Sequence, residues 1–274
     1  MRRLTHAVRV LALSAHNPSP MTAAGNNTYL LPVDDGRAVL VDAGVGHEQH
    51  LADLARELDA AHCRLAHVIV THGHADHASG APALARRHPA ATFAKYLWPE
   101  EDAQYAVGWR RLADGDAIAV GDDEVIALHT PGHSPDHLAF WHASSGTLFT
   151  GDLVIPGGSV MIHASRGGNL GQYLASLERL LALEPRILLP AHGAAIDDPR
   201  AVITGHLEHR RLRERQVVAA LGAGHDTVQT IAESIYHGLD PGLVGYASEN
   251  VRAHLAKLEA EGRAVRADDR WTLA

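Results

Sequence analysis

Three histidines and one aspartate fall within six positions of the sequence THGHADHASG, residues 71–80. They are His72, His74, Asp76 and His77, and they follow directly after the apolar run LAHVIV. Imidazole and carboxylate groups are good ligands for zinc and neighbouring divalent cations. A loop that carries four such donors at the end of a buried strand can aim them at one small volume. The spacing predicts a metal site, and metal-assisted hydrolysis is chemistry that such a site supports.

Three more ligand-type residues stand at the ends of other apolar runs. His133 lies in TPGH, Asp152 in TGD and His192 in PAHG. In open α/β sheets, sites form beyond the carboxyl ends of the strands, so we expect these side chains to meet the loop 71–80. The combined set of five histidines and two aspartates suits two metal ions bridged by a carboxylate.

Short apolar runs that end in Gly, Pro, Asp or His predict the strands that position these residues. The expected strands are 7–13, 27–33, 38–44, 65–72, 124–130, 137–142, 146–152 and 186–193. Segments 47–61 and 169–185 have apolar residues at helical spacing. Strands mixed with helices predict a layered α/β domain.

The pattern changes near residue 205, and we place a boundary within 205–215, giving a catalytic domain 1–205 and a smaller domain 206–274. Segment 206–221 reads as a charged, partly exposed helix. A second helix is expected after Asp226 as N-cap with Gln229 at the N3 position. A third helix has apolar positions at Val244, Val251, Leu255 and Leu258. Two short strands around an Asp-Asp turn complete a winged-helix-like pattern.

Composition sets limits on the class of protein. The chain has 274 residues, of which 46% are hydrophobic, so it can bury a sizeable core. A net charge of −8 does not indicate a nucleic-acid or membrane partner. The single cysteine, Cys63, excludes an internal disulfide and is expected to be structural. Segment 1–15 reads as a first strand rather than a signal peptide, which predicts a cytoplasmic protein without a membrane span.

The ordered motifs TH-x-H-x-DH, TPGH, TGD and AHG resemble those of the metallo-β-lactamase superfamily, over roughly residues 8–205. The resemblance implies an αββα sandwich that holds two divalent ions, with zinc as the default and manganese or iron as alternatives. It also implies three groups of residues: His72, His74 and His133 on one metal, Asp76, His77 and His192 on the other, and Asp152 as the bridge. Asp42 would support the ligand loop without binding metal.

In this reading a hydroxide that bridges the two metals attacks an ester-like bond, and one metal polarises the scissile oxygen. Asp76 would be the catalytic residue, orienting the hydroxide and relaying a proton while it remains a ligand. β-Lactamases of this superfamily typically carry a secretion signal and lack a bridge of the Asp152 type. Antibiotic hydrolysis is therefore not expected.

Segments outside the metal motifs are similar to the β-lactamase-like protein 2 group, whose members end in a small winged-helix domain. These segments are NPSPMTAAGNNTYLL, YLASLERLLAL, HRRLRERQVV and NVRAHLAKLEAEGRA. Characterised members of that group are endoribonucleases on single-stranded RNA, and related fungal members are thioesterases that release polyketides.

Three hypotheses follow. The first is a hydrolase of a small-molecule thioester or lactone, and the second is a metal-dependent endoribonuclease on single-stranded RNA. The third is a nucleic-acid-binding regulator, but its recognition helix would offer only Arg252 and Lys257. Segment 201–274 holds nine Lys or Arg and ten Asp or Glu, so it has no net basic field. The small domain would then shape the cleft, pack on the catalytic domain or mediate a homodimer.

Several individual residues carry smaller expectations. His137 is expected in a packing or supporting role, and His47 and His50 on a helix surface. The cluster Arg210, Arg211, Arg213 and Arg215 is interpreted as a solvated, salt-bridged helix face.

Trp98, Tyr105 and Trp109 are expected to pack their own insertion rather than wall a pocket. Arg166 lies in a segment expected along the rim of the site, where an exposed loop arginine is the more common outcome and contact with an anionic substrate such as a CoA or glutathione thioester is the alternative. Gly132, Gly151 and Gly193 are expected to allow tight turns beside the metals.

Overall fold

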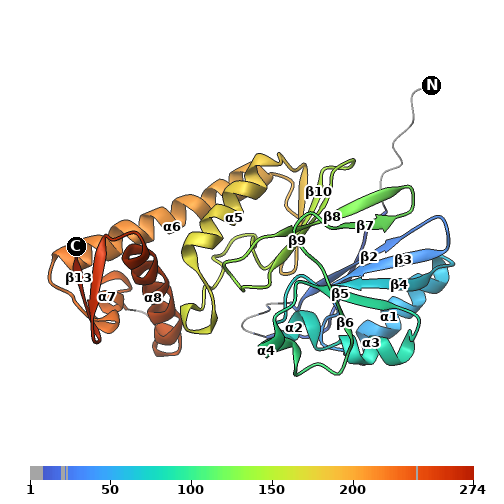
Figure 1. Ribbon diagram of the computed structural model, residues 1–274, viewed down its shortest axis with the longest axis horizontal. Coiled ribbons are helices and arrows are strands. Elements are labelled where there is room, and N and C mark those ends of the chain that lie inside the picture. Colours follow the sequence, from blue (N-terminus) through green and yellow to red (C-terminus); the bar gives the residue numbers. More distant parts are fainter. Residues whose placement is uncertain (1–8, 20–21, 23, 239) are drawn as a thin grey trace.

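The computed structural model describes residues 9–19, 22, 24–238 and 240–274. Two β-sheets lie face to face between helices, and a smaller lobe extends from one end of this sandwich (Figure 1). The expected first strand falls partly on residues 1–8, which lie outside the described residues. Among the described residues, no helix is long and apolar enough to cross a membrane.

The first sheet has six strands in the order β1 to β6. They are β1 Leu11–Ser14, β2 Asn27–Pro32, β3 Arg37–Val41, β4 Arg64–Ile69, β5 Thr92–Lys95 and β6 Trp109–Arg111. Strands β3 to β6 pair in parallel, and a helical crossover connects each of them to the next. Helices α1 Glu48–Ala60, α2 Ala75–Ala78 and α3 Ala81–Arg87 follow within this half, as does α4 Pro99–Asp102.

The second sheet has five strands in the order β11-β10-β9-β8-β7. They are β7 Ala117–Val120, β8 Asp123–His129, β9 Leu138–His142, β10 Thr147–Gly151 and β11 Ile187–Pro190. Helix α5, Leu170–Ala182, crosses from β10 to its parallel neighbour β11, after the short helix η1 Ala164–Arg166. All eight strands predicted from the sequence are therefore present at least in part, whereas β5, β6 and β7 were not predicted.

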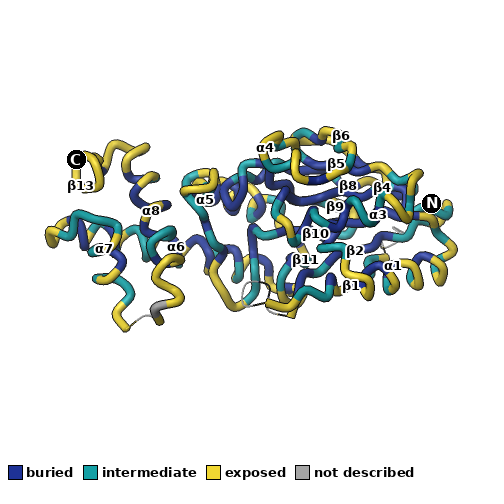
Figure 2. The backbone as a smooth tube through the Cα atoms, turned by 90° about the horizontal axis from the view of Figure 1, so that it is seen from below, coloured by how far each residue is buried: buried dark blue, intermediate teal, exposed yellow. Residues whose placement is uncertain are grey.

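Side-chain alternation divides the core into layers. Leu30 and Leu40 pack under the helices of the first half, whereas Leu31 and Val39 face the opposite sheet. The rings of Tyr29 and Phe149 meet between the sheets at a centroid distance of 5.4 Å. Figure 2 shows the sheet strands largely buried and the outer turns of α1 exposed. The predicted αββα sandwich is confirmed.

One long helix joins the sandwich to the C-terminal lobe. Helix α6, Pro199–Gly222, runs through the proposed boundary at 205–206 without a break. Ile203 and Leu207 pack in the core of the second half, whereas Val217 and Leu221 pack in the core of the lobe. Both units therefore share this helix, which leads from one hydrophobic core into the other (Figure 1).

The lobe contains helices and a hairpin, as a winged-helix pattern requires. The elements are α7 Val228–Ile235, η2 Pro241–Leu243, α8 Val244–Ala260, β12 Ala264–Ala267 and β13 Arg270–Leu273. The expected cap was wrong by one residue, since Thr227 caps α7 in a capping box with Thr230. Its side chain, rather than that of Asp226, accepts the backbone N–H at N3. Val244 was expected on the apolar, core-facing side of the third helix, but it is 46% exposed.

Candidate metal centre

The loop that follows β4 brings four candidate ligands to the carboxyl end of the first sheet. His72 and His77 are fully buried there, and α2 starts directly after His74. His74 Nδ1 lies 2.9 Å from His72 Nε2 and 3.1 Å from His133 Nε2. These three nitrogen atoms converge on one volume, as three ligands of one cation would.

A second group of donors lies beside the first. The Oδ2 atom of Asp76 is 3.5 Å from His77 Nε2 and 3.5 Å from His192 Nε2. Within the described chain, sets of three donor atoms lie within 4.8 Å of one another in three overlapping groups. The groups are His72, His74 and His133; His72, His77 and Asp152; and Asp76, His77 and His192. All seven candidate residues are thus gathered from four strand ends.

Asp152, directly after β10, lies between the two groups of donors. Its Oδ1 atom is 3.2 Å from His192 Nε2 and 3.5 Å from His77 Nε2. Its Oδ2 atom is 3.6 Å from His133 Nε2, which belongs to the other group. The Oδ1 atom is buried and makes no hydrogen bond within the described chain. A carboxylate that presents one oxygen to each set of imidazoles has the chemistry of a bridging ligand.

Protonation differs between the two groups of imidazoles. Burial and the neighbouring histidines lower the pKa of His72 well below its ordinary value, and burial and His133 lower that of His74 to about 4. Burial also opposes the charged form of His192, but the carboxylates of Asp152 and Asp76 raise its pKa to about 9. A cation bound at His192 would have to displace a proton, so its binding would be coupled to pH.

Asp42 and Asn26 fix the orientation of the ligands. The Asp42 carboxylate accepts hydrogen bonds from the Thr71 backbone N–H at 2.7 Å and from His77 Nδ1 at 2.9 Å. This agrees with the supporting position expected for Asp42. Asn26 was not singled out from the sequence, although it is 1% exposed and its Nδ2 donates to Asp76 Oδ2 at 3.0 Å. The Asn26-Asn27 pair at the start of β2 was the available signal.

Two glycines allow the backbone to pass close to the centre. Gly132 has φ +136°, and a Cβ atom there would lie 2.3 Å from the backbone nitrogen of Tyr173. Gly151 has φ +50°, and its Cβ atom would lie 2.6 Å from His137 Nε2. Both positions therefore require glycine, as expected from the motifs. His137 has the expected supporting contacts, since Nε2 accepts from the Asp152 backbone N–H at 3.2 Å and Nδ1 pairs with Thr130.

A buried ion-pair network contacts the backbone of the loop 71–80, and it was not predicted from the sequence. Lys95 Nζ is 2.7 Å from Asp136 and 2.5 Å from Asp102, and the lysine side chain is fully buried. Asp136 in turn accepts the Gly73 backbone N–H at 2.8 Å. Tyr105 donates from its hydroxyl to the Gly73 carbonyl, and its ring lies 6.4 Å from that of Trp109, so it joins its own insertion to the loop 71–80.

Two of the expectations for individual residues were wrong. His50 is not on a helix surface: it is fully buried, and its Nε2 pairs with the Thr28 hydroxyl at 2.9 Å. Arg210 is not solvated: it is 2% exposed and donates to the Val160 carbonyl. Arg211 is exposed and pairs with Glu178, as a solvated face requires. Arg166 is exposed in η1, and its role toward a substrate stays a prediction.

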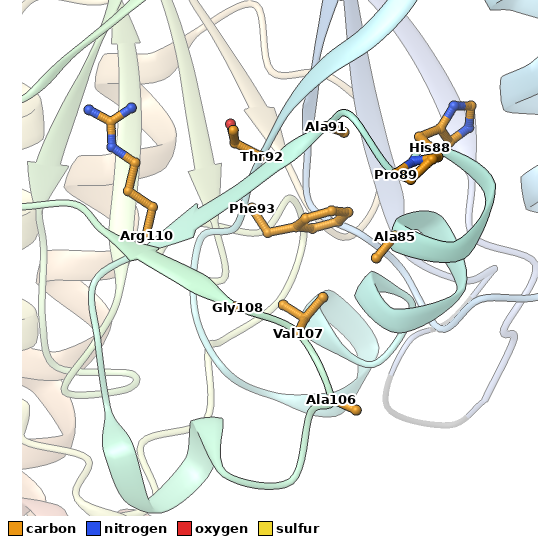
Figure 3. Close-up of a pocket in the computed structure, with 10 residues that line it drawn as sticks. All are labelled: Ala85, His88, Pro89, Ala91, Thr92, Phe93, Ala106, Val107, Gly108 and Arg110. Carbon is orange, nitrogen blue, oxygen red and sulfur yellow. The ribbon is translucent and has the colours of Figure 1, made fainter.

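Other hollows lie away from the ligands. A cavity of about 410 Å³ is lined by Phe93, Val107 and Arg110, where β5 and β6 meet the end of α3 (Figure 3). Another of about 320 Å³ lies between β4, β5 and β7. None of the seven candidate ligands lines either cavity. Both cavities therefore lie outside the candidate metal centre.

Comparison with known proteins agrees with this geometry. Residues 21–192 match the family model described as metallo-beta-lactamase superfamily, and residues 227–271 match a beta-lactamase-associated winged helix domain. A crystal structure of a beta-lactamase domain protein from Burkholderia ambifaria is 28% identical, with a TM-score of 0.79 over 97% of this chain and 91% of that one.

Curated relatives include proteins of fungi and of an insect. The lactamase-like protein aptB of Emericella nidulans is 35% identical over 78% of this chain and 65% of its own length, so the chain spans slightly under two thirds of that protein. An atrochrysone carboxyl ACP thioesterase of Claviceps purpurea is 32% identical, covering 83% of this chain and 72% of that protein. A beta-lactamase-like protein 2 homolog of Drosophila melanogaster is 30% identical, covering 95% and 90%. The chain therefore belongs to the metallo-beta-lactamase superfamily and carries the associated winged helix domain.

Proposed function

We propose that this protein is a metal-dependent hydrolase whose seven clustered residues hold two divalent cations, with zinc as the default. The observation that carries the proposal is the position of Asp152, with one oxygen toward His133 and the other toward His77 and His192. Imidazole nitrogens and carboxylate oxygens suit zinc, and they also suit manganese or iron.

Two such cations would supply a water of lowered pKa and polarisation of the scissile oxygen. The protein's own side chains would transfer the proton and orient the ligands. Asp76 is 28% exposed at its side chain and is held by Asn26, so it can meet a substrate and accept or return a proton. His77 is fixed by Asp42, which keeps its Nε2 directed toward the centre.

For the substrate we propose a small molecule with an ester-like bond, a thioester or a lactone. Support comes from the relative named as an ACP thioesterase. The charge distribution also favours this choice over RNA, because several exposed or half-buried basic side chains of α6, α8 and the turn after α8 are paired. Glu214 binds Lys257 at 2.6 Å and Arg263 at 2.7 Å, and Arg211 faces Glu178. A track of free cations for phosphates is not formed by these residues.

The test combines metal content with turnover of S-acyl thioesters, lactones and single-stranded RNA, each with and without chelator. We expect two metal ions per chain and chelator-sensitive cleavage of a thioester or lactone. Asp152→Ala should remove at least one metal and reduce turnover by about 100-fold or more, because the bridge and the water position are lost. Asp197→Ala, which removes an exposed carboxylate from the segment after His192, should behave like the parent.

Each alternative outcome has a distinct meaning. Chelator-sensitive cleavage of RNA that Asp152→Ala abolishes would replace the small-molecule substrate with RNA. Absence of bound metal after repletion with zinc, manganese and iron would overturn the hydrolase proposal itself. Full activity in Asp152→Ala would show that the chemistry lies elsewhere.

A further inference from the structure

A third hollow, between the two units of the chain, has no role in the chemistry described above. It is a pocket of about 240 Å³ between the segment 159–161, helix α6 and the winged helix domain. Both units of the chain contribute to it: Val160 and Met161 come from the loop after β10, and Tyr236, Leu243 and Tyr246 come from the C-terminal lobe. We call it the junction pocket.

Two arginines of α6 line the junction pocket without an acidic partner. Arg210 is 2% exposed and donates to neutral groups, the Val160 carbonyl and Asn250 Oδ1. Arg213 stacks over the ring of Tyr236 at 4.7 Å and donates to Gln216 Oε1. The Nε atoms of both arginines are buried and have no hydrogen-bond partner within the described chain.

Burying the two arginine cations without a negative charge nearby costs free energy unless an anion binds beside them. A buried cation is stable when a charge of opposite sign and further hydrogen bonds accompany it. No Asp or Glu is among the residues that line the pocket, and His209, whose pKa is lowered by burial and by the two arginines, supplies no opposite charge. An arginine fork with free donors matches a carboxylate or a phosphate.

Much of the remaining wall is apolar, and part of it is open to solvent. Leu243 is 47% exposed and Tyr246 is 36% exposed, while Val160, Met161 and Ala247 line the interior. Adjacent exposed apolar side chains beside polar groups indicate a binding surface. The pocket therefore fits an apolar or aromatic body that carries an anionic group.

The segment that lines the junction pocket also contacts the candidate metal centre. Met161 lines the pocket, and its carbonyl oxygen pairs with Nδ1 of the candidate ligand His133 at 2.8 Å. Ser165, further along the same segment, donates to Glu249 of α8 at 3.0 Å, which ties the rim of the site to the lobe. Met161 therefore contacts both a candidate ligand and the pocket, and a substrate bound at both would have to place its reacting bond at the metal centre and its other end in the pocket.

We propose that the junction pocket binds the unreactive end of the substrate, an apolar or aromatic group bearing a carboxylate or phosphate, through Arg213 and Arg210. This inference rests on the proposed hydrolase function and names the chemical class of its substrate. It also gives the winged helix domain a role: the domain supplies Tyr236, Leu243 and Tyr246 to substrate selection.

The first experiment measures binding without turnover. Calorimetry with naphthalene-2-sulfonate uses an aromatic anion that is a weak metal ligand, and methyl 2-naphthyl sulfone is the neutral match. On the metal-replete protein, we expect the anion to bind about tenfold or more tightly than the sulfone, as loss of a charged hydrogen bond implies. Arg213→Gln should abolish this preference. Arg211→Gln, one exposed arginine on the same helix, should retain it.

Tyr246→Ala provides a second variant, because this side chain is partly exposed and its loss should not prevent folding. It should weaken binding of both probes equally, since it removes the aromatic wall and no charge. Equal binding of the anion to the parent and to Arg213→Gln would overturn the proposal, as would failure of the anion to bind the parent.

Turnover separates this proposal from the hydrolase proposal. Two thioesters of one thiol, with acyl chains ending in a carboxylate or a carboxamide, would be compared. Arg213→Gln should raise KM for the acidic thioester about tenfold and leave the neutral one unchanged. If both substrates are hydrolysed and Arg213→Gln affects them equally, the pocket proposal fails and the hydrolase stands. If the anion binds through Arg213 but no ester-like bond is cleaved, the hydrolase proposal fails.

Discussion

At the scale of single residues, Asp42 is a group outside the candidate ligand set on which the proposed metal affinity should depend. It has φ +62°, is 3% exposed, and accepts from Thr71 and from Nδ1 of His77. This contact fixes which nitrogen of His77 is directed to the centre. Asp42→Asn keeps the shape and tolerates the left-handed backbone. We expect it to lower metal affinity by about 10- to 100-fold.

A competition titration against a chelating dye would measure that loss. Asp35→Asn is a suitable control, because Asp35 is an exposed carboxylate that pairs with Arg37 in the β2–β3 turn. Its metal affinity should equal that of the parent. If Asp42→Asn also binds metal like the parent, the carboxylate does not orient His77 as inferred from the geometry.

At the scale of elements, the ligand loop after β4 depends on strands and helices that are distant in the sequence. Lys95 of β5 holds Asp136 and Asp102, and Asp136 holds the backbone of Gly73. Lys95→Met would leave two carboxylates without their cation, in a site where Asp136 is 1% exposed. We expect the free energy of unfolding to fall by about 3–5 kcal/mol.

Urea unfolding followed by circular dichroism would measure this change. Arg87→Met is the matched control, since it breaks the exposed pair with Glu48 and should cost less than about 1 kcal/mol. A loss of 1 kcal/mol or less in Lys95→Met would contradict the argument, because it would mean that the two carboxylates find other partners.

The sequence predicts these elements where the pattern is local, and it does not where the contacting residues are distant in the sequence. The strands that end in ligands were predictable, because each is a short apolar run followed directly by His or Asp. The Lys95 network was not, since its acids come from α4 and from the turn before β9 and no local spacing relates them. His50 was misplaced although a signal existed: it is spaced by four from Leu54 and by eight from Leu58, on the buried face of α1.

At the scale of the whole molecule, the junction between the two units concentrates buried basic groups. His254 of α8 is 1% exposed, and neither of its ring nitrogens has a hydrogen-bond partner within the described chain. Burial, together with Arg210, Lys257, His209 and Arg213, lowers the pKa of His254 to about 3. The histidine is therefore neutral in the folded protein across the physiological range.

This burial makes stability depend on pH. The unfolded histidine has a pKa of about 6.5, so below that pH the unfolded state binds a proton that the folded state does not. Stability from this group is thus complete above about pH 6.5 and falls with pH until the folded pKa is reached. At pH 5.0 the loss from one such histidine is about 2 kcal/mol. His254→Leu should remove this part of the acid sensitivity.

The measurement is the free energy of unfolding at pH 7.5 and at pH 5.0 for the parent and the variant, because contributions from other groups cancel in the difference. We expect His254→Leu to lose about 2 kcal/mol less than the parent on acidification. It should also be at least as stable at pH 7.5, since it removes two buried, unpartnered nitrogens. His237→Leu, at an exposed position of the same lobe, should retain the parent's full acid sensitivity. Equal acid sensitivity in the parent and in His254→Leu would show that the junction takes up protons at another residue.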